Sequence, residues 1–168
     1  MSADQIVNHR SRSWNIIAGT KPNSGLASEV CNAVPDVTDW TSISAGQLQN
    51  PVGWWPNRTV KVGLPTYEVE LPGVAIEFIL KFKYGSRYKG GGAYVEACWI
   101  EVGNFFLEWG FEVWVAADVG TLRNVGSQRA PIALLPIKVS GDMTTPGWRK
   151  PVRWDLEVRG DGKIDIVF

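Results

Sequence analysis

Strict alternation of apolar and polar residues marks the second half of the chain as β-structure. In residues 74–84 most even positions are apolar, whereas Glu77, Lys81 and Lys83 occupy odd positions. Successive side chains of a strand point to opposite faces, so the pattern predicts a half-buried strand. One face of this strand is expected to line a core and the other to meet solvent.

The next two alternating segments are predicted to form a hairpin. They span residues 93–102 and 105–115, and Gly103-Asn104 between them is a turn signal. Alternation in these segments and in the chain's other strand patterns also predicts which tryptophans belong to the core. These are Trp14, Trp99, Trp109 and Trp154.

A second hairpin is predicted at the C-terminus. Residues 152–159 and 164–168 alternate on either side of the short glycine-rich turn Gly160-Asp161-Gly162. Arg159-Gly160-Asp161 matches an integrin-binding tripeptide, but such a match is common by chance, and we interpret it first as part of the turn.

The region before this hairpin is less regular. Residues 132–139 resemble a strand, and Pro136 within them predicts an edge strand or a bulge. Residues 140–151 contain glycine and proline and are predicted to form a long loop.

The whole chain, residues 1–168, is predicted to be a single all-β domain. A loop-rich N-terminal third, about residues 1–73, precedes a regular antiparallel sheet formed by about residues 74–168. No segment shows the 3.6-residue period of a helix. Many short strands separated by turns predict an antiparallel β-sandwich, with a jelly-roll-like arrangement as one form and a closed β-barrel as the alternative.

The composition of the chain limits the classes of binding partner that we expect. The chain has 17 Lys and Arg residues against 17 Asp and Glu, so its formal net charge is zero. A general nucleic-acid binder needs a positive surplus to neutralise phosphates, and none is expected here. The N-terminus lacks the apolar core of a signal peptide, and no apolar run could span a membrane. We therefore expect a soluble protein that is cytoplasmic or is exported without a signal peptide.

Cysteine and histidine are scarce. One histidine, His9, and two cysteines, Cys31 and Cys98, are too few for a zinc site built from these residues alone. We expect neither a metal site nor a cofactor. The cysteines are far apart in sequence and are expected to be reduced thiols, although a fold that brought them together would allow a disulfide.

Tryptophan is abundant, with nine residues, and some of them fall in proline- and glycine-rich segments that look like loops. Aromatic rings on loops suit the faces of sugars and the headgroup layer of lipids. The candidate ligand-binding residues are Trp54, Trp55, Arg58, Tyr88 and Trp148. The alternative is that these rings cover the open ends of a sandwich.

The carboxylates give weaker evidence of a functional site than the aromatic residues do. Glu108 and Glu112 flank Trp109 and Gly110 in a pattern that would suit a concave sugar-binding sheet. They lie about 13 Å apart along one strand, too far to act as a pair on a glycosidic bond without a partner from another strand. A solvated outer face explains the same pattern, and these residues are the only catalytic candidates.

Non-catalytic recognition of a carbohydrate or cell-surface glycoconjugate through loop aromatics is the leading interpretation. The first alternative is a membrane-active β-sandwich toxin whose aromatic loops bind lipid headgroups at a membrane surface. A carboxylate-dependent enzyme acting on a glycan is the second alternative. A structural or assembly subunit, including a homo-oligomer, is the third.

Overall fold

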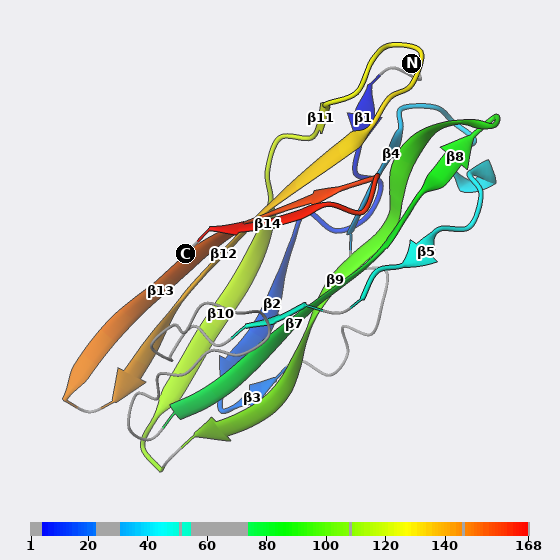
Figure 1. Cartoon of the computed structure of the whole chain (residues 1–168). Coiled ribbons are helices and arrows are strands. Elements are labelled where there is room, and N and C mark those ends of the chain that lie inside the picture. Colours follow the sequence, from blue (N-terminus) through cyan, green and yellow to red (C-terminus); the bar gives the residue numbers. More distant parts are fainter. Residues whose placement is uncertain are drawn as a thin grey trace.

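The protein is a sandwich of two antiparallel β-sheets packed against each other (Figure 1). This computed structural model describes residues 5–22, 31–50, 52–54, 74–107, 109–145 and 147–167. In this part of the chain the only helix is a short 3-10 turn, η1 (Trp40–Ser42). The predicted β-sandwich is therefore confirmed. The alternative of a closed barrel is wrong, because the sheets do not join edge to edge.

Sheet 1 has the strand order β1–β4–β9–β7–β5, with β6 also paired to β7 and β8 to β9. Its strands are β1 (Ile6–Val7), β4 (Cys31–Pro35), β5 (Gln47–Leu48), β6 (Val52–Trp54), β7 (Val74–Tyr84), β8 (Ser86–Tyr88) and β9 (Gly91–Leu107). At 17 residues, β9 is the longest strand and runs along the whole sheet.

Sheet 2 has the order β14–β13–β12–β10–β2–β3, with β11 also paired to β12. Its strands are β2 (Ser13–Gly19), β3 (Lys21–Pro22), β10 (Glu112–Val119), β11 (Arg123–Asn124), β12 (Ala133–Thr145), β13 (Trp148–Arg159) and β14 (Ile164–Val167). The N-terminal third of the chain contributes β2 to this sheet and β4 to the other, so its described part forms no layer of its own.

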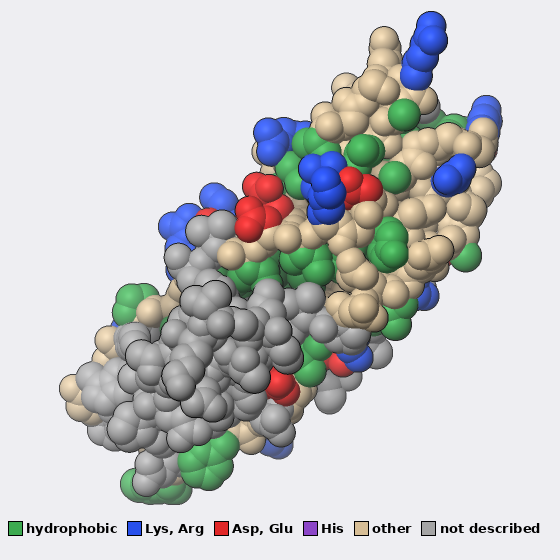
Figure 2. Space-filling view, in the orientation of Figure 1, with side chains coloured by type: hydrophobic (Ala, Val, Ile, Leu, Met, Phe, Trp, Pro, Cys, Tyr) green, Lys and Arg blue, Asp and Glu red, His purple; other side chains and the backbone are tan. Residues whose placement is uncertain are grey.

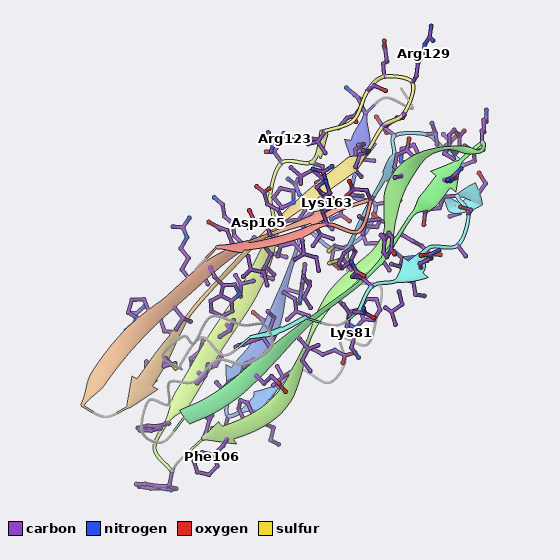
Figure 3. All side chains as sticks on the ribbon, in the orientation of Figure 1. Lys81, Phe106, Arg123, Arg129, Lys163 and Asp165 are labelled. Atoms are coloured by element: carbon purple, nitrogen blue, oxygen red, sulfur yellow. The ribbon has the colours of Figure 1, made fainter. Side chains whose placement is uncertain are left out.

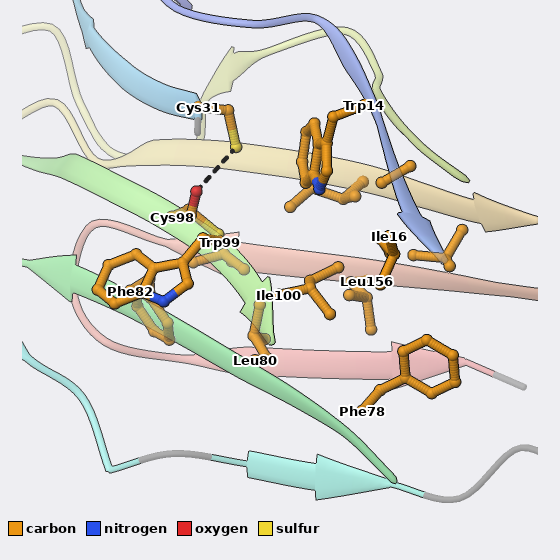
Figure 4. Packing of buried hydrophobic residues seen from close by; sticks show 14 of the residues in the cluster. Trp14, Ile16, Cys31, Phe78, Leu80, Phe82, Cys98, Trp99, Ile100 and Leu156 are labelled. Carbon is orange, nitrogen blue, oxygen red and sulfur yellow. Dashed lines mark hydrogen bonds between the residues drawn. The ribbon is translucent and has the colours of Figure 1, made fainter. Parts of the chain in front are cut away.

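The core lies between the two sheets, and on β7 its inward positions are those that alternation predicts (Figure 4). On sheet 1, Phe78, Leu80 and Phe82 point inward and are fully buried or nearly so. The ring of Phe78 meets that of Trp154 from sheet 2 edge-on, with centroids 5.2 Å apart. Burial of Trp14, Trp99 and Trp154 is confirmed. Strand β7 and the C-terminal hairpin of β13 and β14 also lie where the sequence predicts them.

The predicted hairpin centred on Gly103-Asn104 is wrong. Strand β9 continues through these two residues to Leu107, and the chain then turns at Trp109-Gly110 into β10. Strands β9 and β10 do not pair with each other, because β9 belongs to sheet 1 and β10 to sheet 2. The prediction that Trp109 belongs to the core is also wrong, since its side chain is 96% exposed.

Gly103-Asn104 forms a bulge instead of a turn. In the register of β7 with β9, Ile76 lies opposite Phe105 and Phe78 opposite Val102, so β9 has one extra residue between these pairs. A Cβ atom at position 103 would lie 2.9 Å from Ile79 Cδ1, so this side chain would have to shift to make room for it. After the bulge the inward positions change from even to odd numbers, which turns Phe106 outward.

The predictions for residues 132–151 are corrected as well. Strand β12 is central in sheet 2, between β10 and β13, and Pro136 does not place it at an edge. Proline is tolerated because β10 ends at Val119, opposite Ile137, so Pro136 lies just beyond that ladder. Residues 140–151 are not a long loop, because β12 and β13 pair as far as Thr145 and Trp148.

The two sheets are connected at both ends of the sandwich. At one end, residues 108–111 carry the chain from β9 to β10. At the other end, the Gly85 amide of sheet 1 donates to the Gly160 carbonyl of sheet 2 at 2.8 Å. The Ala93 amide of β9 also donates to the Pro131 carbonyl at 2.8 Å. Neither sheet is therefore free at its ends.

Candidate functional site

Aromatic side chains gather at the end of the sandwich where β9 leads into β10, and two of them, Phe106 and Trp109, are exposed. We call Phe106, Trp109 and Phe111 of this segment the aromatic tip. It borders an open hollow of about 500 Å³. The residues that line the hollow are Thr20, Phe105, Phe106, Leu107, Trp109, Gly110, Phe111 and Glu112. Its volume is within the range of small-molecule binding sites.

Local backbone geometry produces this exposure. Phe106 points outward because of the bulge at Gly103-Asn104 and is 58% exposed. Gly110 has a φ of 88°, a left-handed conformation that glycine adopts without strain, and it turns the chain away from β9. Trp109, just before this glycine, is thereby left in solvent. Figure 3 shows Phe106 at the lower end of the sandwich, and Figure 2 shows hydrophobic side chains there.

Trp114 adds a third exposed ring near the hollow. It is 52% exposed and lies two residues beyond Glu112 on the outer face of β10. Its ring lies against Gly19, where a Cβ atom would be 3.5 Å from Cζ2, and Gly19 directly precedes Thr20 of the hollow. Among the described residues five large hydrophobic side chains are exposed, and three of them, Phe106, Trp109 and Trp114, are at this end.

Two of the residues singled out in the sequence also lie at this end. Glu112 lines the hollow itself. Trp148 begins β13 opposite Thr145, and Thr144 lies opposite Glu112, so the backbone of Trp148 is two strands, roughly 10 Å, from β10. Its placement in a loop is wrong, because β13 already begins at this residue.

Trp54 and Tyr88 also lie on strands rather than in loops. The backbone of Trp54 ends β6 and pairs with Phe78 on β7. Tyr88 ends β8 and pairs with Gly91, at the start of β9. The hollow is at the other end of β9, so Tyr88 is roughly 50 Å from it along that strand. Tyr88 and Trp148 therefore cannot contribute to one small-ligand site.

Tyr88 has partners of its own at the far end of the molecule. Its hydroxyl donates to Asp39 Oδ1 at 3.0 Å, and the Lys89 ammonium lies 5.3 Å from the centre of its ring. These contacts account for the ring as part of the local structure. Trp55, Arg58 and Glu108 lie outside the described residues.

A second carboxylate lies near Glu112 on sheet 2. Glu112 and Asp142 share the outer face at diagonal positions in the register of β10 with β12, roughly 7–8 Å apart between Cα atoms. Arg149 Nη2 donates to Asp142 Oδ2 at 2.6 Å and thereby lowers the pKa of this carboxyl group. An acid catalyst needs the opposite shift, a raised pKa.

Metal and membrane-spanning features are also not found in the described part of the chain. No group of three or more His, Cys, Asp and Glu side chains there could hold a metal ion. No helix in those residues is long and apolar enough to cross a membrane.

Arg159-Gly160-Asp161 forms the predicted turn, and its two charged side chains bind each other. Arg159 donates from Nε to Asp161 Oδ1 at 3.1 Å and from Nη2 to Oδ2 at 2.7 Å. Partial burial alone would raise the pKa of Asp161, but hydrogen bonds from Arg159 and the Lys163 amide outweigh it and lower the pKa. Gly160 is buried, so the tripeptide is a turn whose centre is packed into the fold.

A second polar cluster lies on sheet 1, where Glu101 is held by two partners. Lys81 Nζ lies 2.8 Å from Glu101 Oε2, and Trp99 Nε1 donates to Oε1 at 2.9 Å. Lys81 is the main cause of a lowered pKa of Glu101. The ion pair therefore stabilises the fold above the unfolded-state pKa of about 4.3, and this contribution is lost as the pH falls through the folded-state value.

Replacing Lys81 by methionine is expected to raise the pKa of Glu101 toward its ordinary value. The pair is partly exposed, so the free energy of unfolding at neutral pH should fall by less than about 1 kcal/mol. The pKa is measured by NMR from the carboxyl carbon shift of Glu101 during a pH titration. Lys83→Met is the matched control and should leave this pKa unchanged. An unchanged pKa in Lys81→Met would contradict the assigned cause.

Comparison with known proteins gives no family and no relative for this chain. No family model matches it, and no curated protein and no solved structure matches it either. The sandwich and the aromatic tip are therefore the basis of any functional proposal.

The sequence offers Glu112 only as a catalytic candidate, and it does not predict Phe106, Trp109, Phe111 and Thr20 as a group. Alternation over residues 105–115 predicts one strand, which places Trp109 in the core. The signal that could have prevented this is Gly110, because an isolated glycine within a strand pattern often marks a break or a bulge.

Proposed function

We propose that the protein is a non-catalytic carbohydrate-binding β-sandwich whose ligand site is the aromatic tip and its hollow. The observation that carries this proposal is the exposure of Trp109 and Phe106 beside a hollow that also contains polar groups. Flat aromatic rings stack on the apolar faces of sugars, and carboxylate and hydroxyl oxygens accept or donate hydrogen bonds to sugar hydroxyls. Glu112 and Thr20 supply such oxygens.

Charge at the hollow favours neutral glycans. Glu112 is the charged residue among the described side chains that line it. A negative carboxylate repels sialic acids and sulfated sugars while it accepts hydrogen bonds from neutral hydroxyls. We therefore expect neutral glycans to bind more tightly than anionic ones.

Binding to a lipid surface is the second candidate, and the nearly complete exposure of Trp109 favours it. Tryptophan at the end of an elongated protein can enter the headgroup layer, with its ring among the acyl carbons and its indole N–H in the polar region. Glu112 next to it favours zwitterionic over anionic lipids. The two candidates use the same residues and differ in the ligand.

A glycan array tests the proposal with single alanine variants of the tip. Trp109→Ala and Phe106→Ala are expected to lower the affinity for the bound glycan at least about tenfold. Their circular dichroism and melting temperature should be unchanged, since both side chains are exposed. Free sugar should compete with binding by the parent protein.

Leu48→Ala is the matched control. Leu48 is 56% exposed, close to the value for Phe106, but it pairs with Lys83 while Phe106 pairs with Ala75. The two positions are therefore about 26 Å apart along β7, and Leu48→Ala should bind like the parent protein. Absence of glycan binding by the parent, or equal binding by both tip variants, would overturn the proposal.

Two further measurements test the lipid candidate and a glycan site outside the aromatic tip. Co-sedimentation with phosphatidylcholine vesicles and dye release, both abolished by Trp109→Ala and unaffected by sugar, would support the lipid candidate in place of the glycan one. Loss of glycan binding in Trp55→Ala with full binding in Trp109→Ala would move the site away from the tip.

A further inference from the structure

The two cysteines of the chain are direct neighbours across strands. Cys31 in β4 and Cys98 in β9 are 67 positions apart in sequence and lie opposite each other in the antiparallel register. Cα atoms of opposed residues in such a pair are about 4.5–5.5 Å apart. A disulfide bond spans Cα separations of about 4.4–6.8 Å, so the backbone already has the spacing that the bond requires.

Figure 4 shows the Cys31 sulfur pointing toward the backbone carbonyl oxygen of Cys98. Cys31 Sγ donates to the Cys98 carbonyl oxygen at 3.5 Å, and both residues are fully buried, free thiols. The neighbouring Cys31 side chain, together with burial, raises the pKa of Cys98. The reduced pair is therefore protonated and shielded, and it reacts slowly until the strands around it open.

An edge of sheet 1 lies close to this pair. Strand β4 is second in the order of the sheet, and its outer neighbour β1 pairs through only two residues, Ile6 and Val7. Those residues lie opposite Pro35 and Val34, at the far end of β4 from Cys31. Local opening of β4 can expose the thiols without separating β9 from β7, which pair over most of their length.

We propose that Cys31 and Cys98 form a reversible dithiol–disulfide site, oxidised by a low-molecular-weight disulfide of the glutathione class. The thiolate of one cysteine attacks a sulfur of the oxidant, which releases one small thiol and leaves a mixed disulfide. The thiolate of the other cysteine attacks the protein sulfur of that mixed disulfide and releases the second small thiol. The two protons of the cysteines pass to the two released thiols.

Oxidation has a defined structural effect. The new bond joins β4 to β9 and closes a long loop in the unfolded chain, which lowers the entropy of the unfolded state. The melting temperature of the oxidised protein is therefore higher by on the order of 10 °C. The aromatic tip is at the end of β9 farther from Cys98 and keeps its structure in both redox states.

In the experiment, the full chain in its reduced form is incubated with mixtures that differ in the ratio of oxidised to reduced glutathione. Free thiols are counted by alkylation under denaturing conditions and intact mass spectrometry, and a non-reducing digest maps the linkage. The expected result is a change from two alkylated cysteines to none, with a Cys31–Cys98 linked peptide. The melting temperature rises as stated, and dithiothreitol reverses all three changes.

Cys31→Ala and Cys98→Ala are the controls, and each should gain at most one glutathione and show no rise in melting temperature. Should either variant fail to fold, the thiol count and linkage of the parent protein still decide the question. Two thiols that remain alkylatable at the most oxidising ratio would overturn the proposal. A linkage only between chains, or an intramolecular bond without a rise in melting temperature, would overturn it too.

Discussion

Phe78→Ala is expected to lower the free energy of unfolding by about 3–5 kcal/mol. Phe78 is fully buried at the centre of the sandwich and is the residue through which β7 contacts the Trp154 ring of sheet 2. Removing the ring leaves a cavity between two sheets whose backbones are held by their own ladders and cannot collapse into it. The edge-on aromatic contact is lost as well.

Urea denaturation of the parent and variant proteins measures this change, with the two midpoints compared at a common slope. Phe106→Ala is the matched control, because it removes the same ring from an exposed position on the adjacent strand. Its free energy of unfolding should change by no more than about 0.5 kcal/mol. Similar losses in both variants would contradict the assignment of Phe78 to the core and Phe106 to the surface.

Gly141→Ala is expected to cost at least about 3 kcal/mol of stability or to prevent folding. Gly141 lies within β12 opposite Val115, and a Cβ atom there would collide with the Trp114 carbonyl oxygen and lie 2.8 Å from Val115 Cα. These are backbone atoms of the neighbouring strand and cannot rotate away. The register of β10 with β12 would have to shift.

Gly147→Ala supplies the comparison for this variant. Gly147 lies between β12 and β13, where a Cβ atom would meet nothing within 4 Å. Its stability should be unchanged or slightly higher, because alanine restricts the unfolded chain. The difference between the two melting temperatures is the measured quantity. A Gly141→Ala protein as stable as Gly147→Ala would contradict the close approach of β10 to β12.

These glycines also show what could be predicted from the sequence and what could not. Alternation located β7 at its observed bounds, because that strand is apolar throughout on one face and carries Glu77, Lys81 and Lys83 on the other. Gly103 and Gly141 suggested a turn and a loop, yet both lie in strands that another atom approaches closely. Glycine allows a turn because its backbone is free, and it allows a close contact because it has no side chain. The sequence alone does not show which of these two roles a glycine has.

The candidate site was less predictable than the fold. Placing Tyr88 and Trp148 in one binding surface assumes that loop-like segments meet, but strand pairing puts them at opposite ends of the sandwich. The exposure of Trp109 depends on β9 and β10 belonging to different sheets, which is a long-range property of the fold. Local pattern alone assigns both strands to one hairpin.

The connections at both ends of the sandwich determine how its interior can be reached. Residues 108–111 hold one end covalently, and the Gly85–Gly160 and Ala93–Pro131 hydrogen bonds hold the other. We therefore expect local opening to begin at the outermost strands β1, β3, β5 and β14, which pair over two to four residues. A small reagent that reaches the core through such opening enters from the side, at a rate set by fraying of these short strands.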